Sequence, residues 1–324
     1  MFIVRSVELA LPELLPAIAA LRAAEDWAAN AWLLDLVHAW DGARIFVVRA
    51  ALTAPSAASD DPTRVLAAAS ASAYGELGFI GNVIVQPAYR SQGLGKQLMG
   101  AALDWLVAAG VCQVELDATV QGRPLYTRLG FVATVVSWHL MAPLRNLRAD
   151  GLVTDPDQVR IEPLDAATIE RVAQLDRDAF GGDRRGLLAL MLGLSESYGW
   201  MATDESSSPR GYLIVRPPEH GRPGWRIGPW IAQSPSVAAA LLRHAVGSAE
   251  GARLLSGGAS PALLAVVPGA SEVVLEFYRS VGMALARDDL RMRWALPCAS
   301  ERSVITRPRG RADWVYAMLA PMVG

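Results

Sequence analysis

Two glycines and two basic residues follow a short apolar strand in the first third of the chain. Residues 83–98 read VIVQPAYRSQGLGKQL, and the loop after the strand carries Arg90, Gly93 and Gly95. Glycine lets the backbone turn left-handed and approach a ligand closely. The helix that follows begins with unpaired N–H groups and a partial positive charge, and Arg90 and Lys96 add mobile charge there. The stretch therefore predicts an anion site suited to a phosphate or pyrophosphate.

The spacing excludes two other phosphate-binding loops. Lys96 is followed by Gln97, so the G-x-x-x-x-G-K-[ST] loop is absent, and so is the G-x-G-x-x-G of dinucleotide-binding folds. The pattern R-x-x-G-x-G from Arg90 to Gly95 instead resembles the acyl-CoA-binding loop of the GNAT-type N-acetyltransferases. The alternative for the loop alone is an ordinary glycine-rich strand-to-helix turn.

A second motif strengthens this resemblance. Apolar residues recur at helical spacing over 94–109, and Gly110 stands where a helix should stop. A strand is expected at 111–116, and residues 125–131 read LYTRLGF, which resembles the L-Y-x-x-L-G-F that closes a GNAT core. Two motifs in the right order and at the right distance are more specific than either one. The resemblance covers roughly residues 1–142.

The resemblance implies how acetyl-CoA would bind and react. Pantetheine is expected to pair like an added strand with the backbone at 83–85, and the pyrophosphate to lie over 92–96. The implied coenzyme-binding residues are Val83, Ile84, Val85, Arg90, Ser91, Gln92, Gly93, Leu94, Gly95 and Lys96. Tyr126 matches the family tyrosine that points its hydroxyl at the thioester sulfur and can act as a general acid. It could instead only pack its helix against the sheet.

The sequence does not identify the base that deprotonates the acceptor amine. Glu76, before one strand, and Asp117, at the end of the next, are candidates, although each could be a turn or structural residue. Glu25 and Asp26 could recognise a cationic amine. Proton transfer through ordered water is equally compatible, so no residue is assigned as the base.

The expected fold is α/β (α+β), with two tandem GNAT-like domains, each a mixed, mainly antiparallel central sheet flanked by helices. The first half follows the β-α-α-β-β-β-α-β-α-β order of such a domain. Helices are expected at about 13–23 and 30–40. Trp27, Trp32 and Trp40 lie on or between them and could line an acceptor pocket or form a packing stripe.

Length and local composition predict the domain boundaries. A chain of 324 residues is long enough for two domains. We expect an N-terminal, acetyl-CoA-binding and catalytic domain over 1–142 and a C-terminal domain over 159–324. The polar, proline-bearing stretch 143–158 would link them.

The second half repeats parts of the first. The stretch GNVIVQ at 81–86 matches GPWIAQ at 228–233, and YTRLGF at 126–131 matches YRSVGM at 278–283. The loop that follows Gln233 nevertheless reads SPSVAAALL and has neither glycine nor cation.

This difference predicts a degenerate C-terminal domain that binds acyl-CoA poorly or not at all. The segment RIGPWIA at 226–232 resembles the C-terminal domain of some tandem GNAT proteins. Trp225 and Trp230 are expected to pack in the core.

Composition and charge restrict the classes of partner and cofactor that the protein is expected to bind. A net charge of −2 argues against nucleic acid and acidic membranes. Two unpatterned cysteines and four scattered histidines suggest neither a disulfide framework nor a metal site. No apolar run reaches 18 residues, so no membrane span and a cytoplasmic location are expected.

The function predicted is transfer of acetyl from acetyl-CoA to a primary amine, with a small-molecule acceptor favoured over a protein and with a monomer or homodimer as the assembly. The alternative is a non-catalytic acyl-CoA-binding sensor or scaffold.

Overall fold

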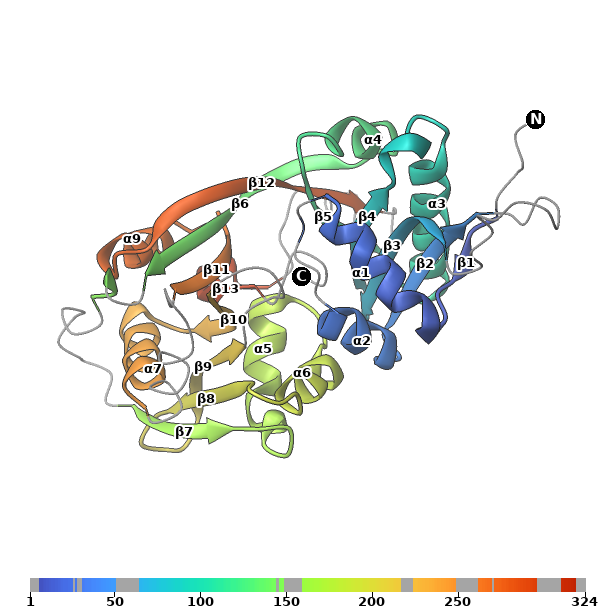
Figure 1. Ribbon diagram of the computed structural model, residues 1–324. Coiled ribbons are helices and arrows are strands. Elements are labelled where there is room, and N and C mark those ends of the chain that lie inside the picture. The colour runs from blue at the N-terminus through green and yellow to red at the C-terminus, as the bar shows by residue number, and fades with distance from the viewer. Residues whose placement is uncertain are drawn as a thin grey trace.

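The strands of both halves form one large mixed sheet. The computed structural model describes residues 6–25, 27, 31–50, 64–143, 146–148, 159–216, 224–248, 262–269, 271–295 and 310–318. Within them the sheet has 13 strands in the order β1-β2-β3-β4-β5-β12-β6-β11-β10-β9-β8-β7, and β13 pairs with β10. Only β4–β5 and β10–β11 pair in parallel, and the other described pairs are antiparallel. The expected fold class is confirmed (Figure 1).

The first half has the predicted order of helices and strands. Its elements are β1 (Glu8–Leu9), α1 (Leu15–Ala23), α2 (Ala31–Ala39), β2 (Ala43–Arg49), β3 (Val65–Tyr74), β4 (Leu77–Val85), α3 (Leu94–Ala108), β5 (Gln113–Ala118), α4 (Arg123–Arg128) and β6 (Val132–Pro143). The elements of the second half are β7 (Arg160–Leu164), α5 (Ala173–Phe180), α6 (Arg185–Leu192), β8 (Tyr198–Thr203), β9 (Pro209–Arg216), β10 (Trp225–Ala232), α7 (Pro235–Gly247), β11 (Ala262–Pro268), α9 (Glu272–Ser280), β12 (Ala284–Ala295) and β13 (Val315–Ala317).

The glycines of the second motif end helices. α4 stops where Gly130 takes a φ of +89°, and the Phe131 N–H donates to the Tyr126 carbonyl at 3.0 Å. α9 ends in the same way, with Gly282 at +82° and the Met283 N–H on the Tyr278 carbonyl at 3.0 Å. A left-handed residue that closes this hydrogen bond is a standard helix stop, and glycine adopts it without strain. The shared geometry supports the internal repeat.

The two halves exchange their longest strands. β12, from the second half, pairs with β5 and sets Arg291 opposite Asp117. β6, from the first half, pairs with β11 and sets His139 opposite Val266. β6 and β12 also pair with each other and run together between the two lobes (Figure 1). The boundaries at 142 and 159 remain a prediction about the chain, because the sheet itself continues across them.

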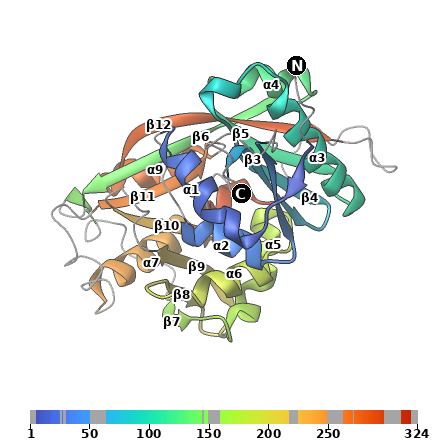
Figure 2. The ribbon, with the colours of Figure 1, turned by 45° about the vertical axis from the view of Figure 1, so that its right-hand side comes forward.

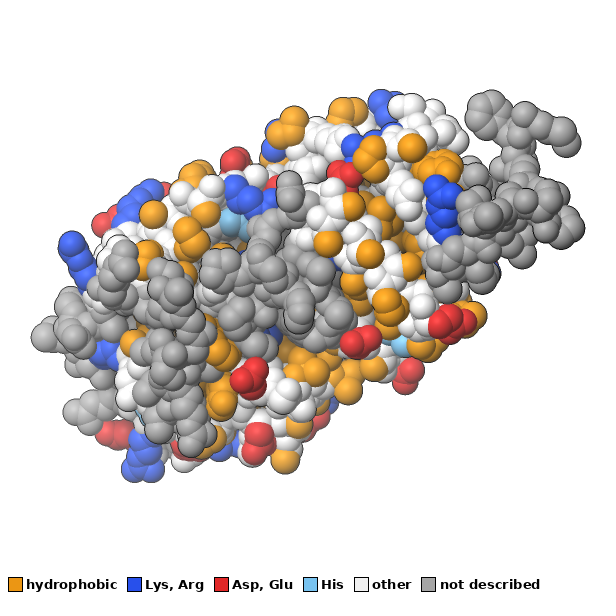
Figure 3. Space-filling view, in the orientation of Figure 1, with side chains coloured by type: hydrophobic (Ala, Val, Ile, Leu, Met, Phe, Trp, Pro, Cys, Tyr) orange, Lys and Arg blue, Asp and Glu red, His pale blue; other side chains and the backbone are white. Residues whose placement is uncertain are grey.

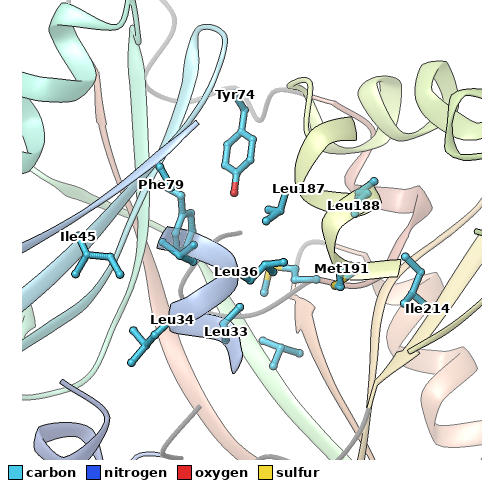
Figure 4. Packing of buried hydrophobic residues seen from close by; sticks show 14 of the residues in the cluster. Leu33, Leu34, Leu36, Ile45, Tyr74, Phe79, Leu187, Leu188, Met191 and Ile214 are labelled. Atoms are coloured by element: carbon cyan, nitrogen blue, oxygen red, sulfur yellow. The ribbon is translucent and has the colours of Figure 1, made fainter. Parts of the chain in front are cut away.

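An apolar cluster joins the halves on the side of α2. Leu36 of α2 points toward Leu187 and Met191 of α6 (Figure 4). Leu33 and Leu34 belong to the same cluster, and all five side chains are at most 4% exposed. α2 lies beside α6 in both ribbon views (Figures 1 and 2). Burial of each large apolar side chain stabilises the contact by about 1.5–3 kcal/mol. The two halves therefore share one core at this contact.

The structure also bears on the predictions about the tryptophans of the second half, the cysteines and membrane-spanning helices. Trp230 is fully buried among aromatic rings and Trp225 is 8% exposed, which confirms that both pack in the core. Cys112 is disulfide-bonded, so the expectation that the cysteines form no disulfide was wrong. Among the described residues, no helix combines the length and apolar character that crossing a membrane requires.

Candidate active site

A cavity of about 820 Å³ opens where β4 and β5 separate. The two strands pair only from Leu77–Phe79 to Gln113–Glu115. Beyond that point, 80–85 of β4 and Asp117 of β5 line the cavity. A register shift against β3 and a φ of +54° at Asn82 mark a bulge in β4. The structure thus brings Val83, Ile84 and Val85 to the cavity wall.

The first turn of α3 closes one end of the cavity. Gly93 precedes the helix with a φ of +83°, and no side chain among the described residues caps the helix start. Gly93, Leu94, Gly95 and Lys96 all line the cavity. An uncapped helix start presents backbone N–H groups and a positive dipole end to any anion there. A Cβ added at Gly95 would come within 3.1 Å of the Leu125 side chain, so this position has little spare room.

Arg90 is held at the rim of the cavity. Its Nε donates to the Val85 carbonyl at 3.0 Å, and its guanidinium lies 2.5 Å from a Glu25 carboxylate oxygen. Ser91 also lines the cavity. Gln92 is not among the described cavity-lining residues, and its side-chain amide donates to the Ala88 carbonyl at 3.3 Å.

Tyr126 lies on α4 and faces the same cavity. The side chain is 7% exposed and packs against Phe131. Burial raises the pKa of Tyr126 above its usual value, so the phenol stays protonated at neutral pH. The Tyr126 hydroxyl makes no hydrogen bond to a described residue. A Cβ on Gly122 would meet the ring at 2.7 Å, so the bare glycine makes room for this tyrosine.

The carboxylates considered as bases have other positions or partners. Both oxygens of Asp117 are occupied: Ser137 donates at 2.6 Å, and Arg291 donates at 2.9 and 2.8 Å. Glu76 is exposed just before β4, at the end opposite to the cavity. Asp26 lies outside the described residues. Asp117 is therefore a structural ion-pair partner that ties β12 to β5.

The structure reveals a pair of residues that the sequence did not indicate. His139 of β6 and Asp289 of β12 both line the cavity, and the Nε2 atom of His139 lies 2.8 Å from Oδ2 of Asp289. Burial alone would raise the pKa of Asp289, but the hydrogen bond with His139 and the charge of Arg287 lower it below its usual value. The two residues are 150 positions apart, so no local signal could have found the pair.

The second half supplies the far wall of the cavity. Arg226 of β10 and Arg287 of β12 line it beside residues of the first half such as Arg22 of α1. In the space-filling view, basic side chains and a histidine gather where β6 and β12 pass between the lobes (Figure 3).

The three tryptophans of the first half separate in space. Trp27 lines the cavity beneath the Arg22 guanidinium, whose carbon lies 5.6 Å from the ring centroid. Trp40 stacks on Tyr74 in the contact between the halves. The side chain of Trp32 lies outside the described residues. The pocket interpretation therefore applies to Trp27 and the packing interpretation to Trp40.

Family models match both halves of the chain. The acetyltransferase (GNAT) family matches residues 27–131, and an acetyltransferase (GNAT) domain matches 172–292. The two matches together cover more than half of the chain. It belongs to the GNAT acetyltransferase family. The chain carries two GNAT domains in tandem, as the sequence predicted.

Known proteins agree with this assignment. The uncharacterized N-acetyltransferase YitH of Bacillus subtilis is 30% identical over 186 residues, which cover 55% of this chain and 59% of that relative. The chain thus matches less than two thirds of that relative's length.

Solved structures support the tandem fold. A putative acetyltransferase from Pyrococcus horikoshii superposes with a TM-score of 0.70 at 18% identity, over 100% of this chain and 97% of the other. A tandem GNAT protein from the clavulanic acid biosynthesis pathway gives 0.60 at 12% identity, over 90% and 98%. At these identities the likeness concerns the fold alone.

Proposed function

We propose that this protein transfers an acetyl group from acetyl-CoA to a primary amine, with the reaction in the cavity between β4 and β5. The observation that carries the proposal is the combination of separated strands, an uncapped α3 start with Gly93 left-handed, and Tyr126 facing the same space. The diphosphate would lie on the first turn of α3. Pantetheine would pair with the β4 backbone at 83–85.

The protein has to orient two reactants and manage two protons. An alkyl ammonium has a pKa near 10, so only about 0.1% is neutral and nucleophilic at pH 7. Anchoring the coenzyme at its phosphates and along β4 holds the thioester beside the acceptor, which turns binding energy into orientation.

Tyr126 would serve the leaving group. A thiolate with a pKa near 8.5 leaves readily and needs only a weak acid. Because burial raises the pKa of Tyr126, its phenol is present as a proton donor at neutral pH. The hydroxyl has no described partner that would compete for this proton.

A small-molecule acceptor fits the cavity better than a protein side chain does. Its far wall comes from the second half, through Arg226 and Arg287, and from α1, through Arg22. A lysine on a folded partner would have to reach between both halves, whereas a free amine can diffuse in.

The proposal is tested by thiol release from acetyl-CoA with a panel of amines that includes amino acids, polyamines and aminoglycosides. Sustained release with any amine, together with an acetylated product of the expected mass, supports catalysis. Thermal stabilisation by CoA without release from any amine would instead support the acyl-CoA-binding sensor or scaffold.

A further inference from the structure

The His139–Asp289 pair has the geometry of an oriented proton acceptor. Asp289 is ionised at neutral pH and accepts a hydrogen bond from Nε2 of His139. Nε2 therefore carries the proton of the neutral imidazole, and Nδ1 keeps a free lone pair. A carboxylate that fixes the tautomer of a histidine is the same arrangement that orients the base in hydrolase triads.

The second imidazole nitrogen of this pair is accessible, and the residue lines the cavity. Nδ1 of His139 has no hydrogen-bond partner among the described residues, yet it is not among the buried side-chain atoms that lack a partner. It is therefore accessible, and His139 lines the cavity that also contains Tyr126. Asp289 lies close enough to α4 that the Arg123 charge, one helical turn before Tyr126, helps to lower its pKa.

The charged groups around the imidazole come from three elements. Asp289 and Arg287 face it from β12, Arg123 lies on α4, and Arg226 lines the same cavity from β10. Val266, opposite on β11, carries no charge. One carboxylate is in direct contact with the imidazole, and the other charged groups named here are arginines.

We propose that His139, held by Asp289, takes the proton from the acceptor amine, an inference that rests on the proposed acetyl transfer. The neutral amine then forms the N–C bond to the thioester carbonyl carbon, and the C–S bond breaks. The sulfur receives the Tyr126 proton, and the nitrogen of the tetrahedral intermediate returns a proton to that phenolate. His139 releases its proton to solvent, so each turnover yields an amide, CoA thiol and one proton.

The carboxylates considered from the sequence are not available as the base that deprotonates the amine. Asp117 is saturated by Arg291 and Ser137, and Glu76 lies outside the cavity. The acceptor base would thus come from the two exchanged strands, β6 and β12, and each half would contribute one residue of the pair. The N-terminal half alone would be incomplete for catalysis.

The first test is His139→Gln, which keeps a side-chain N–H for Asp289 but has no basic nitrogen. We expect kcat to fall by about 10²- to 10⁴-fold, the range for a general base, with the KM for acetyl-CoA and the thermal midpoint little changed. In the pH–rate profile of the wild type, we expect kcat to fall at low pH as the base is protonated. This acidic limb should be absent from the profile of His139→Gln. His38→Gln, at an exposed position on α2, is the matched control and should change neither value.

The second test is Asp289→Asn, which removes the charge but leaves a hydrogen-bond acceptor. Loss of the carboxylate removes the partner that stabilises the imidazolium, so the acidic limb of the pH–rate profile should move to lower pH. A purely structural pair would not move that limb. Wild-type kcat in His139→Gln, or an unchanged acidic limb in either variant, would overturn the inference while leaving acetyl transfer intact. Absence of thiol release in the wild type with every amine would instead refute the proposed function.

Discussion

The two halves contain the same opening between parallel-paired strands, but among the described residues a further strand fills only the opening of the second half. In the first half, β4 and β5 diverge around the cavity. In the second half, β10 and β11 pair at Trp225–Ile227, and β13 lies beyond that point. Trp230 and Ile231 of β10 pair with β13, and the Met318 N–H donates to the Val266 carbonyl of β11 at 2.7 Å.

The internal repeat shows which residues of the two halves correspond to each other. Trp230 and Ile231 correspond to Val83 and Ile84, where we propose that pantetheine pairs with the first half. The chain's own strand thus takes the corresponding position in the second half. A Cβ at Gly228 would come within 2.1 Å of the Met318 carbonyl oxygen, so the contact is close.

The matching tyrosines differ in the same way. Tyr126 lines the cavity and its hydroxyl has no hydrogen-bond partner among the described residues, whereas the Tyr278 hydroxyl donates to the Tyr316 carbonyl of β13 at 2.5 Å. Tyr278 is 1% exposed and packs in a cluster with Phe277 and Trp230. The matching tyrosines thus differ in their hydrogen bonding: the hydroxyl of the second half is bonded to the backbone, and that of the first half has no described partner.

The helix starts also differ. α3 begins after Gly93 without a side-chain cap, whereas Ser234 caps α7 by accepting from the Val237 N–H at 3.3 Å. Pro235 then stands at the first turn of α7 and has no N–H to offer. The second helix start therefore offers an anion fewer N–H donors than the start of α3, which agrees with the predicted degeneracy.

The largest effect should come from Tyr126→Phe. Removing the proton donor should lower kcat by about 10²- to 10⁴-fold, whereas Tyr278→Phe should leave it unchanged. Steady-state thiol release measures both variants. A fall of less than about threefold in Tyr126→Phe would mean that the hydroxyl is not the acid.

The next effect concerns coenzyme affinity. Gly95→Leu would place a side chain against Leu125, where the diphosphate is proposed to approach. The Kd for CoA should rise by about 10- to 100-fold, because a lost charge-assisted hydrogen bond costs about 1.5–3 kcal/mol. Pro235→Leu, at the exposed start of α7, is the control and should have no effect. Isothermal titration should give one CoA per chain. Two sites per chain, or equal effects of both substitutions, would contradict the comparison.

The same two tyrosine substitutions should affect the free energy of unfolding in the opposite order to their effects on kcat. Tyr278→Phe loses a buried hydrogen bond and leaves the Tyr316 carbonyl without this donor, which should lower the free energy of unfolding by about 1–3 kcal/mol. Tyr126→Phe loses no described hydrogen bond and should be nearly neutral. Urea denaturation measures both, and equal losses would show that the two hydroxyls are held alike.

The smallest effect should come from the α7 cap. Ser234→Ala removes a side-chain acceptor at the helix start and should cost about 0.5–2 kcal/mol in the free energy of unfolding, with the Kd for CoA unchanged. The same denaturation and titration measurements apply. A change in CoA affinity would indicate that the second helix start still contributes to binding.

The local features of the site could be predicted from the sequence. Gly93 at a positive φ, the start of α3 and the position of Tyr126 before the Gly130 helix stop all depend on neighbours within a few residues. The repeat was visible for the same reason, because Gly282 and Tyr278 reproduce that local geometry. Short-range sterics and hydrogen bonding determine such features.

Tertiary structure decided which strands pair and which side chains meet. The exchange of β6 and β12 joins strands that lie far apart in the sequence. Asp117 and Arg291 are 174 positions apart, and His139 and Asp289 are 150 positions apart. Strand partners and register are selected by burial and cross-strand contacts over the whole sheet, and these leave no trace in local spacing. The sequence by itself thus determined the anion loop and the tyrosine. Only the folded sheet decided which half keeps an open groove, and which side chains reach it.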